Sequence, residues 1–336
     1  MFNVLNFKSD ELRKYLEENK FRGFKANQII DWIYNKKIFD FDDMTNLSNI
    51  ERKQFKDILK IELPLIEKVQ KSIDGTIKFL LKLVDGNLIE CVFMVYDYGN
   101  TICISTQVGC AMGCKFCAST VNGFLRNLEL CELMGQVLVV ERYTSKKINR
   151  IVLMGTGEPL YNYENIITFI REMRSKMGMS RRHITLSTCG IVPKIYDLAN
   201  EGLSINLAIS LHAINDDKRK TIMPIANKYS INQLIDACLN YFDKTKRRIS
   251  FEYLLIDGVN DSDDDVRELV SLCKKSKAHV NLIPVNEINE NDFKESRRLK
   301  KFYNYLLDSG VNVTMRQKKG VDIDAACGQL RLSYSK

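Results

Sequence analysis

The spacing of apolar positions in the first sixty residues is helical. In the stretch KANQIIDWIYNKK, Ile29, Ile30, Trp32 and Ile33 fall on one side of a helix. The stretch SDELRKYLEE begins with a serine, which predicts that Ser9 caps the first helix. We therefore expect a small helical accessory domain over residues 1–60.

The pattern then changes to the alternation that is typical of strands. Ile77, Phe79, Leu81 and Leu83 alternate with Lys78 and Lys82. The pairs Asp74–Gly75 and Asp85–Gly86 favour tight hairpin turns. These features predict an antiparallel β connector over residues 61–99.

From Thr101 onward, apolar strand-like runs alternate with amphipathic segments. The expected strands are TICIST, RIVLM, HITLS, SINLAIS, SFEYLLI, HVNLIP and NVTMR, separated by helices such as INQLIDACLNYF. This order is typical of a parallel α/β sheet with crossover helices, either doubly wound or closed as a barrel. We expect one core domain over residues 100–336, with its ligands at the carboxyl ends of the strands.

Composition narrows the class of protein. The 336 residues are 45% hydrophobic and 27% charged, and no apolar run is long enough for a membrane span. The N-terminus lacks a secretory signal, so we expect a cytoplasmic protein, a monomer without membrane contact. Ten cysteines in a chain of this length favour reduced thiols for metal or catalysis over a disulfide framework. The net charge of +8 is compatible with a phosphate-bearing partner, although each basic cluster taken alone is more typical of a solvated helix face.

Three cysteines lie close together in VGCAMGCKFCAS. Cys110, Cys114 and Cys117 follow a predicted strand, and the neighbouring Gly109 and Gly113 would let a tight loop turn the three sulfurs inward. A structural zinc site or a ferredoxin-type cluster would take four ligands, and no second cysteine pair follows at a suitable distance. Three thiols therefore indicate a cluster with one iron left open, and buried structural thiols are the alternative.

The CxxxCxxC spacing resembles the radical S-adenosylmethionine enzymes. This resemblance implies a partial (β/α)6 TIM-like barrel and a [4Fe-4S] cluster that binds S-adenosylmethionine at its open iron. LMGTGEPL resembles the segment that receives the methionine amino group in that superfamily, here Gly157 and Glu158. The remaining expected cofactor-binding residues end later strands: Ser187, Ser210, Leu211, His212 and Asn286. His212 taken alone is more typical of a core histidine.

Longer motifs narrow the resemblance to one family. TICISTQVGCAMGCKFC, MGTGEPL, TIMPIANKYSI and RQKKGVDIDAACGQL together resemble the RlmN/Cfr family of RNA adenosine methyltransferases over nearly the whole chain. The resemblance implies that Cys327 accepts a methyl group, that Cys103 later releases the product by forming a disulfide, and that Glu90 or Cys103 takes the proton from the adenine ring. We interpret Cys91, Cys131, Cys189, Cys238 and Cys273 as structural.

The resemblance also implies substrates and partners. Pro159 and the stretch GFLRNLEL are similar to the branch that methylates carbon 2 of adenine in 23S rRNA and tRNA, with two S-adenosylmethionine molecules per turnover and an electron donor such as flavodoxin or ferredoxin. The alternative within the family is the Cfr-like branch, which methylates carbon 8 and confers antibiotic resistance. Remoter alternatives are a radical activase and an RNA-binding protein with a structural metal.

Overall fold

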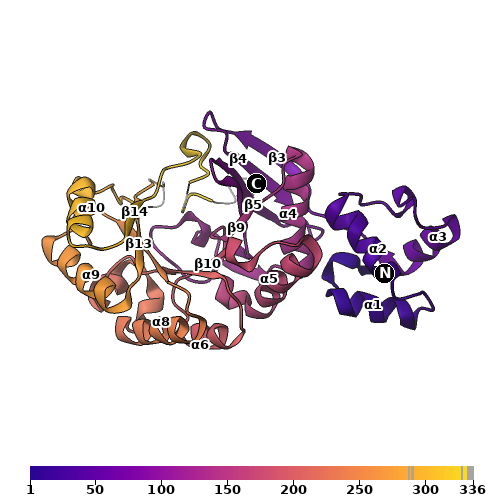
Figure 1. Ribbon diagram of the computed structural model, residues 1–336. Helices are drawn as coiled ribbons and strands as arrows, with labels where there is room; N and C mark the ends of the chain where they lie inside the picture. The colour runs from indigo at the N-terminus through magenta and orange to yellow at the C-terminus, as the bar shows by residue number, and fades with distance from the viewer. Residues whose placement is uncertain (287, 289–290, 327, 331–336) are drawn as a thin grey trace.

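A curved sheet with helices along its outer side forms the larger part of the molecule, and a helical lobe adjoins it at the N-terminal end (Figure 1). The structure is a computed structural model and describes residues 1–286, 288, 291–326 and 328–330. No helix in these ranges is long and apolar enough to cross a membrane.

The N-terminal lobe is helical, as the apolar spacing predicts. A short parallel strand pair joins its two ends, Phe2 with Leu59 and Asn3 with Lys60. Its elements are β1 (Phe2–Asn3), α1 (Ser9–Glu18), α2 (Lys25–Ile30), α3 (Asn49–Ile58) and β2 (Leu59–Lys60). The prediction that Ser9 caps α1 is wrong. Ser9 is the first residue of the helix, and its hydroxyl donates to Glu172 of the larger part instead, at 2.8 Å.

The described residues of the larger part form a ten-stranded sheet in the order β14-β13-β12-β11-β10-β9-β6-β5-β4-β3. The predicted hairpins supply the antiparallel strands β3 (Leu65–Lys71), β4 (Ile77–Lys82) and β5 (Leu88–Tyr96), and β5 pairs directly with the first parallel strand. The parallel strands are β6 (Gly99–Cys103), β9 (Arg150–Leu153), β10 (Ile184–Thr188), β11 (Asn206–Ser210), β12 (Ser250–Leu255), β13 (His279–Pro284) and β14 (Val313–Met315). Each of them matches a strand expected from the sequence.

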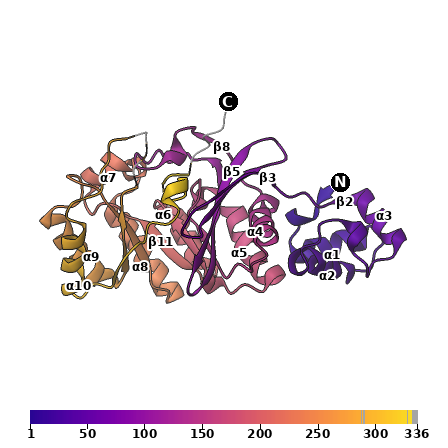
Figure 2. The same ribbon diagram turned by 90° about the horizontal axis from the view of Figure 1, so that it is seen from above.

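The strand order decides between a doubly wound sheet and a barrel. Strands β6 and β9 to β14 lie side by side in chain order, without the reversal that a doubly wound sheet requires. Right-handed crossovers in one direction place every connecting helix on the same face, so the sheet curls as a partial barrel. Those helices are α4 (Leu130–Thr144), α5 (Tyr163–Met177), α6 (Val192–Asn200), α8 (Ile231–Thr245), α9 (Asp263–Ser276) and α10 (Leu299–Asp308). Figure 2 shows the same curvature from above.

Helix α4 links the lobe to the barrel. Its residues are buried nearly all round, which fits a helix enclosed on every side. Gly135 lies against the chain between β2 and β3, where an added Cβ would stand 2.4 Å from Pro64. The lobe is held to the barrel by polar contacts as well, among them Lys37 to Glu141 at 2.6 Å and Lys176 to the Phe7 carbonyl at 2.5 Å. One continuous apolar core extends from the lobe into the barrel.

Candidate active site

The three closely spaced cysteines lie on a loop that a short hairpin presents. Strands β7 (Gln107–Gly109) and β8 (Phe124–Asn127) pair antiparallel and lie between β6 and the first crossover helix. The sequence analysis placed the loop directly after TICIST and missed this hairpin. Gly109 has φ +73°, and a Cβ there would stand 1.8 Å from the Gly123 carbonyl oxygen. Gly113 has φ +69°. Both positions therefore need glycine, as predicted.

Two thiols of this loop, those of Cys110 and Cys114, are buried, and that of Cys117 is partly buried. Burial raises the pKa of Cys110 to about 12 and raises the pKa of Cys114 well above its usual value, and the neighbouring thiols raise both further. Such thiols become thiolates only when a strong positive charge binds them, and this is how iron acts on its ligands. A set of three soft sulfur donors fits an iron–sulfur cluster. Among the described residues, no group of three or more His, Cys, Asp or Glu is arranged to hold a single metal ion.

A cavity of about 180 Å³ opens beside the cysteine loop, inside the barrel and at the carboxyl ends of its strands. A single water needs roughly 10–15 Å³, so this volume admits a ligand of many atoms. Of the predicted site residues, the following line it: Cys103, Cys110, Cys114, Cys117, Gly157, Glu158, Ser187, Ser210, His212 and Asn286. Residues far apart in the sequence are thus brought to one site.

Three predicted site residues stand apart from that lining. Leu211 is fully buried in the core, and its carbonyl oxygen accepts a hydrogen bond from Arg219. Glu90 is buried on β5, on the same face as the lining residues Val92 and Met94, but is not itself among the lining residues. Cys327 lies outside the described residues.

The GTGEP loop is fixed by its own backbone and by one buried carboxylate. Gly157 has φ +107°, and a Cβ there would stand 2.6 Å from the Gln107 side chain. The Glu158 carboxylate accepts from the backbone N–H of Cys189 at 2.7 Å and of Leu160 at 3.0 Å. Burial raises the pKa of Glu158, and these hydrogen bonds oppose that rise. The carboxylate therefore braces the loop against the end of β10.

His212 is both a residue of the cavity wall and a buried core histidine, the two interpretations that the sequence left open. Its ring lines the cavity, yet it is only 4% exposed, and its Nδ1 accepts from the Leu254 N–H at 3.0 Å. Burial and the neighbouring Arg219 lower the pKa of His212 to about 3. The ring contacts Phe116 edge to face, with 4.7 Å between centroids. His212 is thus a neutral, hydrogen-bonded wall of the site.

Glu90 forms a buried ion pair that sequence reasoning missed. Lys78 on β4 lies 3.3 Å from the Glu90 carboxylate, and its side chain is only 6% exposed. The alternation of β4 placed Lys78 opposite the core face, but the chain after β14 covers that opposite face. There the Lys78 ammonium also donates to the Asp324 carbonyl at 3.2 Å. Nothing in the sequence around Lys78 indicates that a distant part of the chain covers this face of β4.

We call residues 316–326 and 328–330 the C-terminal segment. It closes one side of the cavity, with Ala326 and Gly328 among the lining residues. It is joined to the cysteine loop by hydrogen bonds from the Ala118 N–H to the Gly328 carbonyl and from the Ser119 hydroxyl to the Leu330 carbonyl, each at 2.8 Å. The sequence positions on both sides of Cys327 therefore face the same cavity as the cysteine loop.

Sequence reasoning also missed several lining residues. Cys189 lines the cavity, although we interpreted it from the sequence as a structural cysteine. Glu252 and Arg316 line it together and lie 3.6 Å apart. Cys189 could have been identified as a lining residue from its position, because it directly follows HITLST at the carboxyl end of a predicted strand.

Comparisons with known proteins agree with this site. The family model described as "Radical SAM superfamily" matches residues 104–272, and the one described as "Ribosomal RNA large subunit methyltransferase N-terminal domain" matches residues 2–61. The family resemblance inferred from the motifs, with its partial-barrel fold, is therefore confirmed.

Proteins that match this chain over its full length belong to the same family. Two curated proteins, each named "Probable dual-specificity RNA methyltransferase RlmN", come from Clostridium perfringens (strain SM101) and Clostridium botulinum (strain Alaska E43) and are 51% and 53% identical over 100% of this chain and 98% of their own lengths. A solved radical SAM methyltransferase from Sphaerobacter thermophilus has a TM-score of 0.94 at 40% identity and covers 98% of this chain and 99% of its own. The cofactors that this membership implies, a [4Fe-4S] cluster and S-adenosylmethionine, fit the three thiols and the cavity beside them. The chain belongs to the RlmN family of radical S-adenosylmethionine RNA methyltransferases.

Proposed function

We propose that the protein methylates carbon 2 of an adenosine in the peptidyl-transferase centre of 23S rRNA and of the adenosine 3′ of the anticodon in some tRNAs, through a methyl group carried on Cys327. One observation carries the proposal. The neighbours of Cys327 in the sequence, Ala326 and Gly328, line the cavity that also holds Cys103 and the three loop thiols. A thiol between Ala326 and Gly328 would lie within reach of Cys103 and of a cluster held by the loop thiols.

The target atom explains why a thiol carrier is needed. Carbon 2 of adenine lies between two ring nitrogens and is electron-poor, so it does not attack an electrophilic methyl group. A thiolate is a good nucleophile and does so readily. Cys110, Cys114 and Cys117 would hold the cluster, and Gly157, Glu158, Ser187, Ser210 and Asn286 would surround S-adenosylmethionine. When bound, two S-adenosylmethionine molecules per turnover supply the methyl group and an organic radical that activates it on sulfur.

The chain's own residues then complete the reaction. Once the methylene carbon on Cys327 is joined to the adenine ring, the ring proton must leave and the sulfur must be displaced. Cys103 faces the cavity from β6, which suits attack on the Cys327 sulfur to leave a disulfide. Glu90, held by Lys78, is the alternative proton acceptor, and which of the two acts stays open.

The RNA partner has support outside the barrel. The lobe matches a domain model named for ribosomal RNA methyltransferases, and the chain carries a net charge of +8. Basic side chains bind phosphates with little regard to sequence, so recognition of the target relies on RNA shape and on an unstacked base turned into the cavity. We place the reaction in the cytoplasm, with a flavodoxin or ferredoxin as the electron donor.

Nucleoside analysis tests the proposal. The anaerobically reconstituted protein is incubated with a 23S rRNA fragment or tRNA, S-adenosylmethionine and a reductant, and the digested RNA is examined by mass spectrometry. We expect 2-methyladenosine from both RNAs. We expect none from Cys327→Ala, and a normal yield from Cys273→Ala, which removes a buried thiol on α9 far from the cavity.

Other products would point elsewhere. 8-Methyladenosine would assign the chain to the carbon 8 branch. Formation of 5′-deoxyadenosine without any methylated nucleoside would indicate a different radical enzyme. Normal methylation by Cys327→Ala would refute the carrier role of Cys327.

A further inference from the structure

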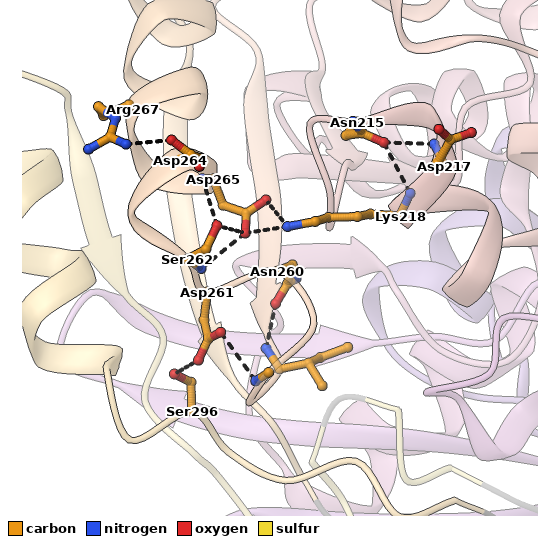
Figure 3. Close-up of polar contacts among 12 residues, drawn as sticks. Asn215, Asp217, Lys218, Asn260, Asp261, Ser262, Asp264, Asp265, Arg267 and Ser296 are labelled. Atoms are coloured by element: carbon orange, nitrogen blue, oxygen red, sulfur yellow. Dashed lines mark hydrogen bonds and ion pairs between the residues drawn. The ribbon is translucent and has the colours of Figure 1, made fainter.

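Helix α7 (Asp216–Ile222) packs against the cysteine loop at one end and is anchored at the other. Its N-terminus is capped by Asn215, whose side-chain oxygen accepts from the N–H groups of Asp217 at 2.8 Å and Lys218 at 3.2 Å (Figure 3). Lys218 reaches Asp265 at the N-terminus of α9, at 2.7 Å, and Ser262 donates to the same carboxylate (Figure 3). The position of α7 is therefore fixed independently of anything bound in the cavity.

The other end of α7 touches the cysteine loop. The backbone N–H of Lys115, next to Cys114, donates to the Ile222 carbonyl at 3.0 Å. A Cβ on Gly113 would meet Pro224 at 3.4 Å, directly after the helix. The side chains of Ile222 and Met223 share a small apolar cluster with Cys114 and Cys189. Helix α7 and the cysteine loop thus form one packed unit.

Arg219 lies on the buried face of α7, in the middle of this unit. It is 0% exposed. Its Nε donates to the Leu211 carbonyl at 3.1 Å, and its Nη2 donates to the carbonyls of Cys189 at 2.6 Å and Ser210 at 3.2 Å. Its Nη1 is buried and has no hydrogen-bond partner, and no carboxylate among the described residues lies within ion-pair distance of Arg219. Carbonyl dipoles hold the guanidinium in place but bring no opposite charge.

A guanidinium stays charged in proteins, and a buried charge without a counter-ion costs several kcal/mol. The acidic groups that interact with Arg219 include the thiols of Cys114, Cys189 and Cys238 and the carboxylate of Asp216. Asp216 accepts from the Ile231 N–H at 2.8 Å, and Cys238 belongs to the apolar core of α8. Arg219 is connected to the cavity through Cys189, which lines it and packs with Cys114. The missing negative charge is therefore expected on the cavity side, where the loop thiols become thiolates when they hold a cluster.

We propose that Arg219 is the buried counter-charge of the iron–sulfur cluster held by Cys110, Cys114 and Cys117, and that it raises the reduction potential of that cluster. The inference rests on the proposed function, because it needs the cluster. Reduction adds one electron from an external low-potential donor and makes the cluster more negative, with no bond formed or broken. A fixed positive charge in a water-excluded place stabilises the reduced form more than the oxidised one. Arg219 acts through the cluster and is a positioning residue.

The test is a redox titration of the full-length, anaerobically reconstituted protein, followed by the electron paramagnetic resonance signal of the reduced cluster. Arg219→Gln removes the charge and keeps an amide donor for the carbonyls, whereas Arg219→Lys keeps the charge. Lys220→Gln is the matched control, because it removes a charge from the exposed face of the same helix. At a fixed potential we expect the ratio of reduced to oxidised cluster to fall at least tenfold in Arg219→Gln, about 59 mV for a one-electron couple. Arg219→Lys and Lys220→Gln should stay close to the original protein.

Three distinguishable results would refute either the role of Arg219 or the proposed function on which it rests. An unchanged potential in Arg219→Gln, at normal iron and sulfide content, would refute the counter-charge role. A negative shift of about 59 mV or more in Arg219→Lys would show that the carbonyl contacts matter rather than the charge, and this result refutes the inference even where Arg219→Gln does not fold. A failure of the original protein to assemble any cluster would instead refute the proposed function.

Discussion

At the scale of single residues, burial sets the ionisation of the groups around the cavity. Burial raises the pKa of Cys110 and Cys114 and lowers the pKa of His212 to about 3, so all three side chains are neutral near pH 7 in the metal-free protein. The site thus offers neutral walls and, upon metal binding, a concentrated negative charge.

The low pKa of His212 predicts an acid sensitivity of stability. The unfolded chain takes up a proton at this histidine below about pH 6.5 while the folded protein does not, so the free energy of unfolding falls with falling pH between about 6.5 and 3. At pH 5 this amounts to about 2 kcal/mol. Denaturant unfolding of the metal-free protein at pH 7.5 and 5 measures it.

His212→Asn is the informative variant for that measurement. Asparagine tolerates the φ of +55° at this position and offers an oxygen to the Leu254 N–H, but it does not titrate. The pH-dependent loss should shrink by about 2 kcal/mol in this variant. The exposed His183→Asn should leave the loss unchanged, and an equal effect of the two substitutions would contradict the prediction.

Cys103→Ala tests the release step. The cysteine faces the cavity from the end of β6, so its removal should leave the RNA joined to Cys327 and yield a protein–RNA adduct on a denaturing gel. Cys91→Ala, in the neighbouring strand and turned into the apolar core, should turn over without an adduct. The absence of an adduct from Cys103→Ala would mean that another group displaces the sulfur.

Individual residues were predictable where chemistry fixes their spacing. Cys110, Cys114 and Cys117 with their glycines were found from the sequence because a tight loop needs that pattern. Lys78 and Arg219 were missed, because a basic residue on an amphipathic element is normally solvated and nothing local indicates what covers it.

At the scale of elements, the C-terminal segment is tied down at one hairpin. Asp322 accepts from the Ser72 hydroxyl at 2.6 Å and from the Ile73 N–H at 3.3 Å. Asp74 of the same hairpin accepts from the Gly320 N–H at 3.1 Å. The turn between β3 and β4 therefore fixes the C-terminal segment at Gly320 and Asp322.

Asp322→Ala should loosen this attachment without touching the cluster. We expect the methylation rate to fall about tenfold or more, with unchanged iron content and unchanged formation of 5′-deoxyadenosine from S-adenosylmethionine. Faster amide exchange in residues 320–326 would confirm the cause. Asp85→Ala, in the next hairpin, is the matched control, and an equal loss of rate there would contradict the assignment.

The strands and crossover helices were predictable because their apolar runs are long and regular. The β7–β8 hairpin was missed because its strands are short and contain glycine and polar residues. The capping role of Ser9 failed because a tertiary contact with Glu172 replaced a local one.

At the scale of the whole molecule, the lobe and the barrel are coupled through buried polar pairs. The Lys37 and Glu141 side chains are 21% and 5% exposed, and Glu141 also accepts from the Ile148 N–H at 2.8 Å. Removing one partner leaves a largely buried charge without its counter-ion. The sequence predicted the two regions but not these contacts, since their residues lie far apart in the chain.

Lys37→Met should therefore destabilise the protein by about 1–3 kcal/mol in denaturant unfolding, and the lobe should become more sensitive to protease. Lys36→Met is the matched control, because Lys36 is 45% exposed and pairs with the exposed Asp31 at 3.4 Å. Its effect should stay below about 0.5 kcal/mol. A similar cost for both substitutions would show that the buried pair does not couple the two parts.

The hairpin that ties down the C-terminal segment also dictates an order of assembly. Ser72 and Asp322 are 250 positions apart, so their contact can form only after 250 further residues have been translated. The cysteine loop emerges much earlier, while the wall that will enclose it does not yet exist. The proposed cluster could therefore be assembled in a nascent protein that is still open on that side, before the C-terminal segment closes it.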